Sequence, residues 1–301
     1  MIRELVDLPL GKFLFTRVSF DSTCNAPYFR LMGADGVFVY ARPAGNFTLT
    51  FDLSRKRCTG WYDMRTGECY ECPGKRAVSE KYEQCPECQQ KTGFNPAFYN
   101  TTELSVQQAE LNKKPHLLYL AYFSLETVKV GISNAGRGLA RLLEQGARSA
   151  VILETFPSAN VARQYEAQIA RLPGLCESVQ LRKKAQILVE NSYDEVAARR
   201  KLEQMITAIQ RALNIQFPNP QFAELSSVMI DDVVLSSCTA IELWNQPHLS
   251  GTFVGLIGQL LVMEQQNRLL AMPMKQYLGN YVTIAGDIAP LKLAPVQASL
   301  F

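Results

Sequence analysis

The feature that most constrains this chain is a pair of Cys-x-x-Cys motifs, Cys69/Cys72 and Cys85/Cys88, with twelve residues between them. A Cys-x-x-Cys turn directs both thiolates toward one point, and two such turns supply the tetrahedral sulfur set that zinc prefers. The sequence therefore predicts a structural zinc ribbon over about residues 55–92. The metal would stabilise a small β module that has little apolar surface of its own.

A fifth cysteine leaves the identity of the four ligands open. Cys58 precedes Cys69 by eleven residues, in the segment RKRCTGWYD. Cys58 on a strand and Cys72 in the turn CPG could bind the metal together with Cys85 and Cys88. Cys69 would then not be a ligand. The firm pair is therefore Cys85 and Cys88. Spacing favours Cys69 and Cys72 as the other two ligands, with Cys58 as the competitor of Cys69.

Composition and patterning restrict the class of protein. Hydrophobic residues make up 47% of the 301 residues and the net charge is +3, so no global field demands a nucleic-acid or membrane partner. The N-terminus MIRELVDLPLGKFLF lacks the basic-then-apolar order of a secretory signal. The longest apolar stretch, Gly251 to Met263, is shorter than the roughly 20 residues that span a bilayer. We expect a cytoplasmic protein with no membrane partner, in which clustered cysteines bind metal.

Strand and helix patterns divide the chain into three regions. Residues 1–114 are expected to form a β-rich region that contains the ribbon and ends in a polar linker. Residues 115–215 show the order β-β-α-β-α, followed by a further amphipathic helix. Residues 216–301 return to strand-like runs from Ser226 onward, separated by Gly and Asn breaks. The sequence therefore predicts an α+β fold.

Four side chains and one glycine of the central region stand out as candidates. Tyr119 lies in the first strand, Lys129 and Gly131 lie at the end of the second, Arg141 lies on the next helix, and Glu166 lies on a later helix. Taken singly, each has an ordinary structural explanation, because Tyr and Gly are common in packed strands and charged side chains usually solvate helix surfaces. Their order is the informative property.

This order resembles the GIY-YIG endonuclease superfamily, whose core has a Tyr-bearing strand, a second strand ending in Gly, a helix carrying Arg and a later helix carrying a metal-binding Glu. The resemblance covers about residues 115–190, with Lys129 in the place of the second motif's tyrosine. It implies phosphodiester hydrolysis with Mg²⁺ or Mn²⁺ held by Glu166. Arg141 would neutralise phosphoryl charge, and Tyr119 would orient or deprotonate water. Lys129 would either assist Tyr119 or only bind phosphate.

A wider resemblance covers most of the chain. A cysteine-rich segment ending in QCPEC, then LYLA, KVG and QGA, then the tail GTFVGLIGQLLVME are similar to a bacterial family without an assigned function. This second resemblance brings no known reaction with it.

Local charge permits a nucleic-acid partner. Between His116 and Asn191 there are nine Lys or Arg residues and six Glu residues, and the run Arg182-Lys183-Lys184 is the candidate for phosphate contact. Two functions fit these features: a metal-dependent nuclease, and a non-catalytic nucleic-acid-binding or assembly module that retains the groove as a surface. A protein-interaction scaffold organised by the ribbon is a third. The sequence specifies neither DNA nor RNA, nor an oligomeric state.

Overall fold

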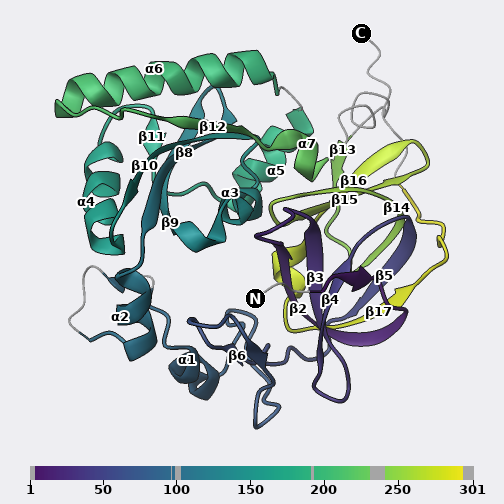
Figure 1. Cartoon of the computed structure of the whole chain (residues 1–301). Helices are drawn as coiled ribbons and strands as arrows, with labels where there is room; N and C mark the ends of the chain where they lie inside the picture. The colour runs from purple at the N-terminus through teal and green to yellow at the C-terminus, as the bar shows by residue number, and fades with distance from the viewer. Residues whose placement is uncertain (1–3, 96, 99–102, 191–192, 231–240, 294–301) are drawn as a thin grey trace.

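The computed structural model describes residues 4–95, 97–98, 103–190, 193–230 and 241–293 of the chain. It contains two main sheets, one at the right of Figure 1 and one at the upper left, with a small two-stranded sheet below them. Helices and strands both contribute throughout, which confirms the α+β fold class. None of the helices among the described residues is long and apolar enough to cross a membrane.

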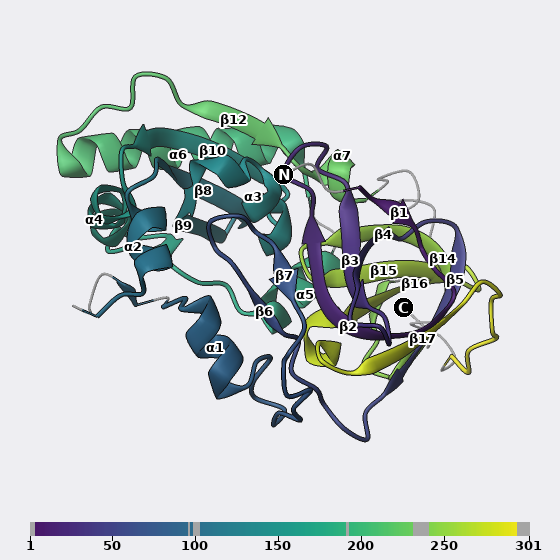
Figure 2. The ribbon, with the colours of Figure 1, turned by 60° about the horizontal axis from the view of Figure 1, so that its bottom comes forward.

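Strands from both ends of the described chain form one large sheet of ten strands, in the order β1-β4-β3-β2-β17-β5-β14-β15-β16-β13. These strands are β1 (Val6–Asp7), β2 (Gly11–Phe20), β3 (Pro27–Met32), β4 (Phe38–Arg42), β5 (Asn46–Asp52), β13 (Ile241–Leu243), β14 (His248–Ile257), β15 (Leu260–Gln265), β16 (Arg268–Pro273) and β17 (Tyr281–Ala285). Strand β17 pairs antiparallel with both β2 and β5, so it lies between two N-terminal strands (Figure 2). The boundaries at residues 114 and 215 stay predictions, but the two β-rich regions share one sheet.

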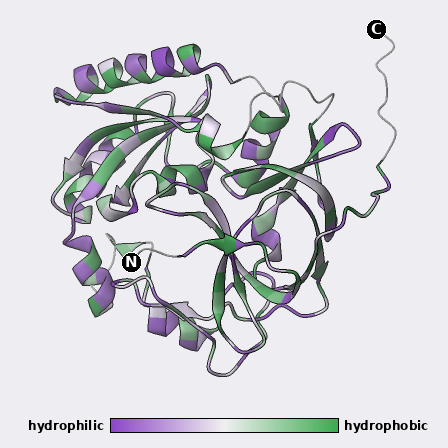
Figure 3. Cartoon of the chain, turned by 45° about the vertical axis from the view of Figure 1, so that its right-hand side comes forward, coloured by the Kyte–Doolittle hydropathy of each residue, from purple (hydrophilic) through white to green (hydrophobic). Residues whose placement is uncertain are grey.

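Aromatic side chains fill the core of the large sheet. The ring of Phe15 packs edge-on against Phe29 and Phe51, with centroids 5.5 and 5.4 Å apart, and Phe51 stacks on Tyr277 at 4.3 Å. Figure 3 shows the strands of this sheet coloured mainly as hydrophobic, whereas the long helix at the top alternates between hydrophobic and hydrophilic. Burial of these rings links β2, β3 and β5 to the segment after β16.

The second sheet has five strands in the order β11-β9-β8-β10-β12. Its strands are β8 (His116–Ser124), β9 (Thr127–Asn134), β10 (Ser149–Phe156), β11 (Leu175–Cys176) and β12 (Gln221–Glu224), and its helices are α3 (Ala140–Gln145), α4 (Ala159–Ile169), α5 (Leu181–Glu190), α6 (Glu195–Leu213) and α7 (Ser226–Met229). Elements β8, β9, α3, β10 and α4 follow the predicted order β-β-α-β-α.

Strand β8 is buried on both faces, which explains its nearly continuous apolar sequence. Leu118, Leu120 and Tyr122 pack in one core with residues of α4 and α6, whereas Tyr119 and Phe123 belong to the core shared with the large sheet. Helices α3 and α5 lie on this second side, between the two sheets (Figure 1). Because successive strand residues point to opposite faces, Tyr119 must face the large sheet.

The run from Ser226 to Leu243 differs from the predicted strand. Residues Ser226–Met229 form helix α7, Ile241–Leu243 form β13, and residues 231–240 lie outside the described part of the chain. The carboxylate of Glu224 accepts hydrogen bonds from the Ser227 hydroxyl at 2.7 Å and from the backbone N–H of Ser226. A carboxylate at this position stabilises the start of a helix, and strand patterning does not take account of it.

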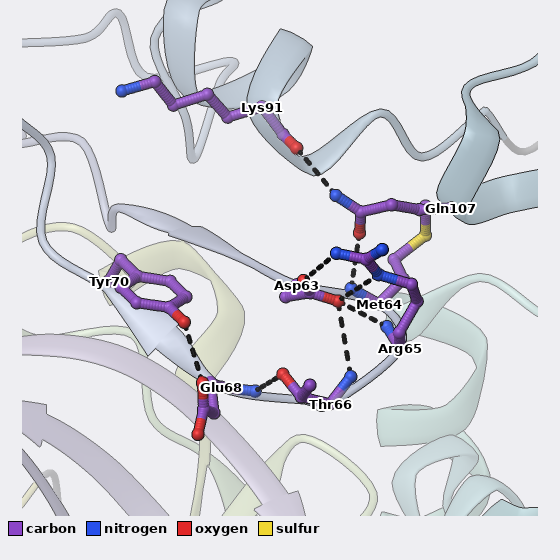
Figure 4. A network of polar contacts seen from close by, with 8 residues as sticks. All are labelled: Asp63, Met64, Arg65, Thr66, Glu68, Tyr70, Lys91 and Gln107. Atoms are coloured by element: carbon purple, nitrogen blue, oxygen red, sulfur yellow. Dashed lines mark hydrogen bonds and ion pairs between the residues drawn. The ribbon is translucent and has the colours of Figure 1, made fainter.

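The cysteine-rich segment forms a small module between the sheets and the linker. It contains β6 (Trp61–Tyr62), β7 (Cys69–Tyr70) and α1 (Pro86–Thr92), and the linker forms the short helix α2 (Val106–Asn112). Figure 4 shows how Gln107 joins these parts. Its Oε1 accepts from the Met64 N–H at 2.8 Å, and its Nε2 donates to the Lys91 carbonyl at 3.4 Å. One side chain therefore ties α2 to the β6–β7 turn and to the end of α1.

Candidate functional site

Four buried cysteines form the first candidate site. The sulfur atoms of Cys58, Cys72, Cys85 and Cys88 all lie within 4.8 Å of one another, and those of Cys72 and Cys85 are 3.8 Å apart. The Cys85 N–H donates to the Cys58 sulfur at 3.1 Å. This group could hold a metal ion.

The sequence preference for Cys69 over Cys58 was wrong, because the Cys69 sulfur lies outside this group. Cys69 is in strand β7, where it pairs with Tyr62, and its sulfur accepts a hydrogen bond from Arg30 Nη1 at 2.7 Å. Strand β7 covers Cys69 and ends at Tyr70, so the motif does not form the single turn that would bring the Cys69 and Cys72 sulfurs together. Gly60, with φ at 83°, lies directly against this strand, since a Cβ atom there would lie 2.0 Å from the Tyr70 carbonyl oxygen.

Protonation of the thiols shows what the four-cysteine group requires. Burial raises the pKa of the Cys58 thiol to about 11 and also raises the pKa of Cys88. Metal ligation needs thiolates, so a bound cation would have to offset this cost.

The second candidate site is a pocket of about 490 Å³ between the five-stranded sheet and the large sheet. Tyr119 from β8, Lys129 from β9, Arg141 from α3 and Glu166 from α4 all line it. Its volume lies in the range typical of small-ligand sites. The structure thus brings together the four residues that the GIY-YIG resemblance singled out.

The tyrosine is held by the two strands and by α3. The β8–β9 register pairs Tyr119 with Gly131, and a Cβ atom at Gly131 would lie 2.5 Å from the Tyr119 oxygen and 2.7 Å from Lys129 Nζ. Only glycine leaves room for both side chains. Gln145 Nε2 donates a hydrogen bond to the Tyr119 oxygen, and Lys129 Nζ lies 5.5 Å from the ring centroid.

Arg141 shares a carboxylate with two other arginines. Its Nη1 lies 3.7 Å from Oε2 of Glu144, whereas Arg17 Nη2 lies 2.9 Å from Oε1 and Arg137 bonds Oε2 more closely. Burial would raise the pKa of Glu144, but the charges of Arg17 and Arg137 and a hydrogen bond from Ser19 outweigh it and hold this pKa at about 2. Glu144 is therefore ionised, and its stronger bonds go to Arg17 and Arg137.

Glu166 is nearly buried and is partly engaged. Its Oε2 accepts from Arg163 Nη1 at 2.7 Å, and the same guanidinium reaches Glu177 Oε2 at 3.2 Å. Among the described residues Oε1 of Glu166 has no hydrogen-bond partner. One oxygen of this carboxylate is thus available to a ligand in the pocket.

The predicted basic run divides into two parts. Arg182 and Lys183 are exposed on α5 and do not line the pocket, whereas Lys184 does. Lys184 Nζ donates to the Gln145 carbonyl at 2.6 Å. Burial, together with the charges of Lys129, Arg141 and Lys275, lowers the pKa of Lys184 to about 8.

Sequence reasoning missed the residues that the large sheet contributes to the pocket. Gln259 and Lys275 line it although they follow the central region by many residues. The signal was present in two glycine-containing segments, QGA and GLIGQLL. A Cβ atom at Gly258 would lie 2.7 Å from the Gly146 nitrogen, so these segments meet backbone to backbone. Gln145 and Arg163 were also missed, because hydrogen bonds to a functional side chain leave no sequence pattern.

Fold and sites together define an α+β protein with a buried four-cysteine group and a charged pocket between two sheets. A family profile described as "Protein of unknown function (DUF2797)" matches residues 48–282, and the chain belongs to this family. The matched span includes all four cysteines and every residue that lines the pocket. No curated protein and no solved structure matches the chain. The expected membership of an uncharacterised family is confirmed.

Proposed function

We propose that this protein acts on nucleic acid by hydrolysing phosphodiesters in the pocket, with one divalent cation bound to Glu166. The observation that supports this most strongly is that Tyr119, Lys129, Arg141 and Glu166, from four separate elements, line one pocket. A general base, a cationic group and a carboxylate must reach a common phosphate for such a reaction.

The available oxygen of Glu166, Oε1, is the atom that would hold Mg²⁺ or Mn²⁺. Such a cation, when bound, polarises the scissile phosphate and stabilises the leaving oxygen. Arg163 restrains the other oxygen at 2.7 Å, which fixes the orientation of the carboxylate. Arg141, with its long ion pair of 3.7 Å, has a guanidinium that can stabilise charge on the phosphoryl oxygens.

Tyr119 is the residue that would orient the attacking water. Since Gln145 donates to the tyrosine oxygen, the O–H proton remains free to point into the pocket. A tyrosine hydroxyl is a weak base near neutral pH, so loss of its proton needs help. The Gln145 amide fixes the position of the tyrosine oxygen, and Lys129 Nζ lies 5.5 Å from the centroid of the ring.

The four-cysteine group, in this proposal, binds one structural zinc ion. Zinc–sulfur bonds of about 2.3 Å in a tetrahedron place the sulfurs about 3.8 Å apart. The 3.8 Å between the Cys72 and Cys85 sulfurs fits this geometry. A closed set of four thiolates leaves no position for substrate, so the role of the ion is to stabilise the module.

The second candidate function is a non-catalytic nucleic-acid-binding or assembly module. The observation that favours it is the ion pair between Glu166 and Arg163 at 2.7 Å, because a carboxylate neutralised by a guanidinium binds a divalent cation less strongly. The basic side chains of the pocket would then bind phosphates without cleaving them.

A cleavage assay separates the two functions. Labelled single-stranded, duplex and branched DNAs and RNAs are incubated with Mg²⁺ or Mn²⁺ and either the wild type or Glu166→Gln. The matched control is Glu203→Gln, since Glu203 is an exposed glutamate of α6 outside the pocket. Cleavage that Glu166→Gln alone abolishes supports hydrolysis. Binding without cleavage by all three proteins supports the module instead.

A further inference from the structure

Three lysines give the pocket an excess of positive charge. Lys129, Lys184 and Lys275 line it, and none of them pairs with a carboxylate of the described residues. The carboxylates of the pocket pair with arginines and not with these lysines. Glu144 pairs with Arg17 and Arg137, and both Glu166 and Glu177 pair with Arg163. Unpaired cations in a concave site attract an anion, because low-dielectric walls focus their field.

Two of the polar residues that line the pocket lie in connections between strands of the large sheet. Gln259 lies in the turn between β14 and β15, and Lys275 lies on the 3₁₀ helix Met274–Tyr277 after β16. The close contact of Gly258 with Gly146, where a Cβ atom would lie 2.7 Å from nitrogen, holds this turn against the end of α3. Lys184 Nζ bonds the Gln145 carbonyl, one residue before Gly146. The two sheets therefore meet where these polar groups lie.

The charges of these groups act on one another. Besides burial, Lys129, Arg141 and Lys275 lower the pKa of Lys184. Mutual repulsion of this kind costs free energy in the unliganded protein, and a bound anion removes the cost.

We propose that Lys184, Lys275 and Gln259 form a second phosphate subsite, built jointly by α5 and the large sheet, which binds the phosphate adjacent to the one that is cleaved. The two ammonium groups attract the phosphate charge, and the Gln259 amide donates to a phosphate oxygen. The assignment to a nucleic-acid strand rests on the proposed function, whereas the anion chemistry depends only on the pocket. The ligand class is a strand with at least two successive phosphates.

Binding measurements test this subsite apart from catalysis. Isothermal titration with pyrophosphate and with a single-stranded trinucleotide is performed without divalent cations, on the wild type, Lys275→Ala and Gln259→Ala. The matched control is Lys292→Ala, since Lys292 is exposed and does not line the pocket. Zinc content and melting temperature are compared first, so that only folded variants are titrated.

We expect Lys275→Ala to lower the affinity for both ligands about tenfold. It should also reduce the slope of log affinity against log salt concentration for the trinucleotide by about 0.7. Gln259→Ala should lower both affinities less, and the affinities of Lys292→Ala should equal those of the wild type. Equal affinities of the wild type and Lys275→Ala would overturn the subsite proposal. The hydrolysis proposal would still be tested by the cleavage assay. Pyrophosphate binding that depends on Lys275, with no trinucleotide binding, keeps the anion subsite and removes the nucleic-acid assignment. If the wild type binds neither ligand, the subsite proposal fails, and the cleavage assay with Mg²⁺ or Mn²⁺ still decides the hydrolysis proposal.

Discussion

At the scale of single residues, Cys58 and Cys69 carry the same thiol in different surroundings. The Cys58 sulfur lies within 4.8 Å of three other sulfurs, whereas the Cys69 sulfur bonds Arg30. We predict that Cys58→Ser abolishes stoichiometric zinc binding and that Cys69→Ser retains one ion per chain. Elemental analysis of purified protein measures this directly. Loss of zinc from Cys69→Ser and its retention by Cys58→Ser would contradict the ligand set.

Glu144 provides a second prediction at this scale. Glu144→Gln leaves Arg17 and Arg137 without their shared carboxylate, and broken buried pairs cost about 3–5 kcal/mol. Both arginines are 38% exposed, so we expect a loss at neutral pH near the lower limit, about 3 kcal/mol of unfolding free energy. Urea denaturation measures it, with Glu203→Gln as an exposed control.

The pH dependence of that loss has a definite sign. The folded pKa of Glu144, about 2, is lower than the ordinary 4.5, so its ionisation stabilises the fold above about pH 4.5. This stabilisation declines as the pH falls from 4.5 toward 2. The difference between the wild type and Glu144→Gln should therefore narrow across that interval. A constant difference would show that the Glu144 charge is not responsible.

At the scale of elements, the sequence predicted best where one pattern decides the structure. Strands β8, β9 and β10 and helices α3 and α4 appear in the predicted order, because apolar patterning and helix capping, as by Ser158 at the start of α4, act within a few residues. The choice between Cys58 and Cys69 failed, because it depends on whether a Cys-x-x-Cys motif lies in a turn or in a strand. That distinction depends on the β6–β7 pairing, which spacing does not report.

The register of β8 and β9 yields a prediction for Gly131→Ala. The added methyl group would meet the Tyr119 oxygen and Lys129 Nζ at 2.5 and 2.7 Å, so the ring must move. We expect a loss of about 1–3 kcal/mol in unfolding free energy and a displaced Tyr119 in a crystal structure of the variant. Gly286→Ala is the control, because its methyl group would approach only the Leu10 side chain, at 3.7 Å. Equal stability of Gly131→Ala and the wild type would contradict the packing.

At the scale of the whole molecule, the arrangement of the two sheets could not be predicted from the sequence patterns. Strand β17 lies in the large sheet between β2 and β5, and Lys275 lines a pocket whose other lysines, Lys129 and Lys184, belong to β9 and α5. Local propensity says nothing about such long-range pairing. The candidate residues of the central region could be predicted because they occur in order along one segment. Gln259 and Lys275 could not, since tertiary packing alone brings them there.

The pocket as a unit predicts how anion binding changes with pH. Lys184, with its pKa lowered to about 8, loses its proton between pH 7 and 9. The other charged groups of the pocket are Lys129, Arg141, Arg163, Lys275, Glu144, Glu166 and Glu177. Trinucleotide affinity should fall over this range, because phosphodiesters stay ionised throughout. Lys184→Arg should bind with little change in affinity, since arginine keeps its charge. An identical decline in both proteins would assign the titration to another group.

The central claim is that Glu166 and Tyr119 act together on a phosphodiester in this pocket. The most direct test is the single-turnover cleavage rate, as a function of Mn²⁺ concentration, on the best substrate of the panel. We predict that Tyr119→Phe lowers this rate by about 10²–10⁴ at saturating Mn²⁺. Glu166→Gln should remove cleavage at every Mn²⁺ concentration, and Glu203→Gln should match the wild type. Rates for Tyr119→Phe and Glu166→Gln equal to that of the wild type would contradict the account.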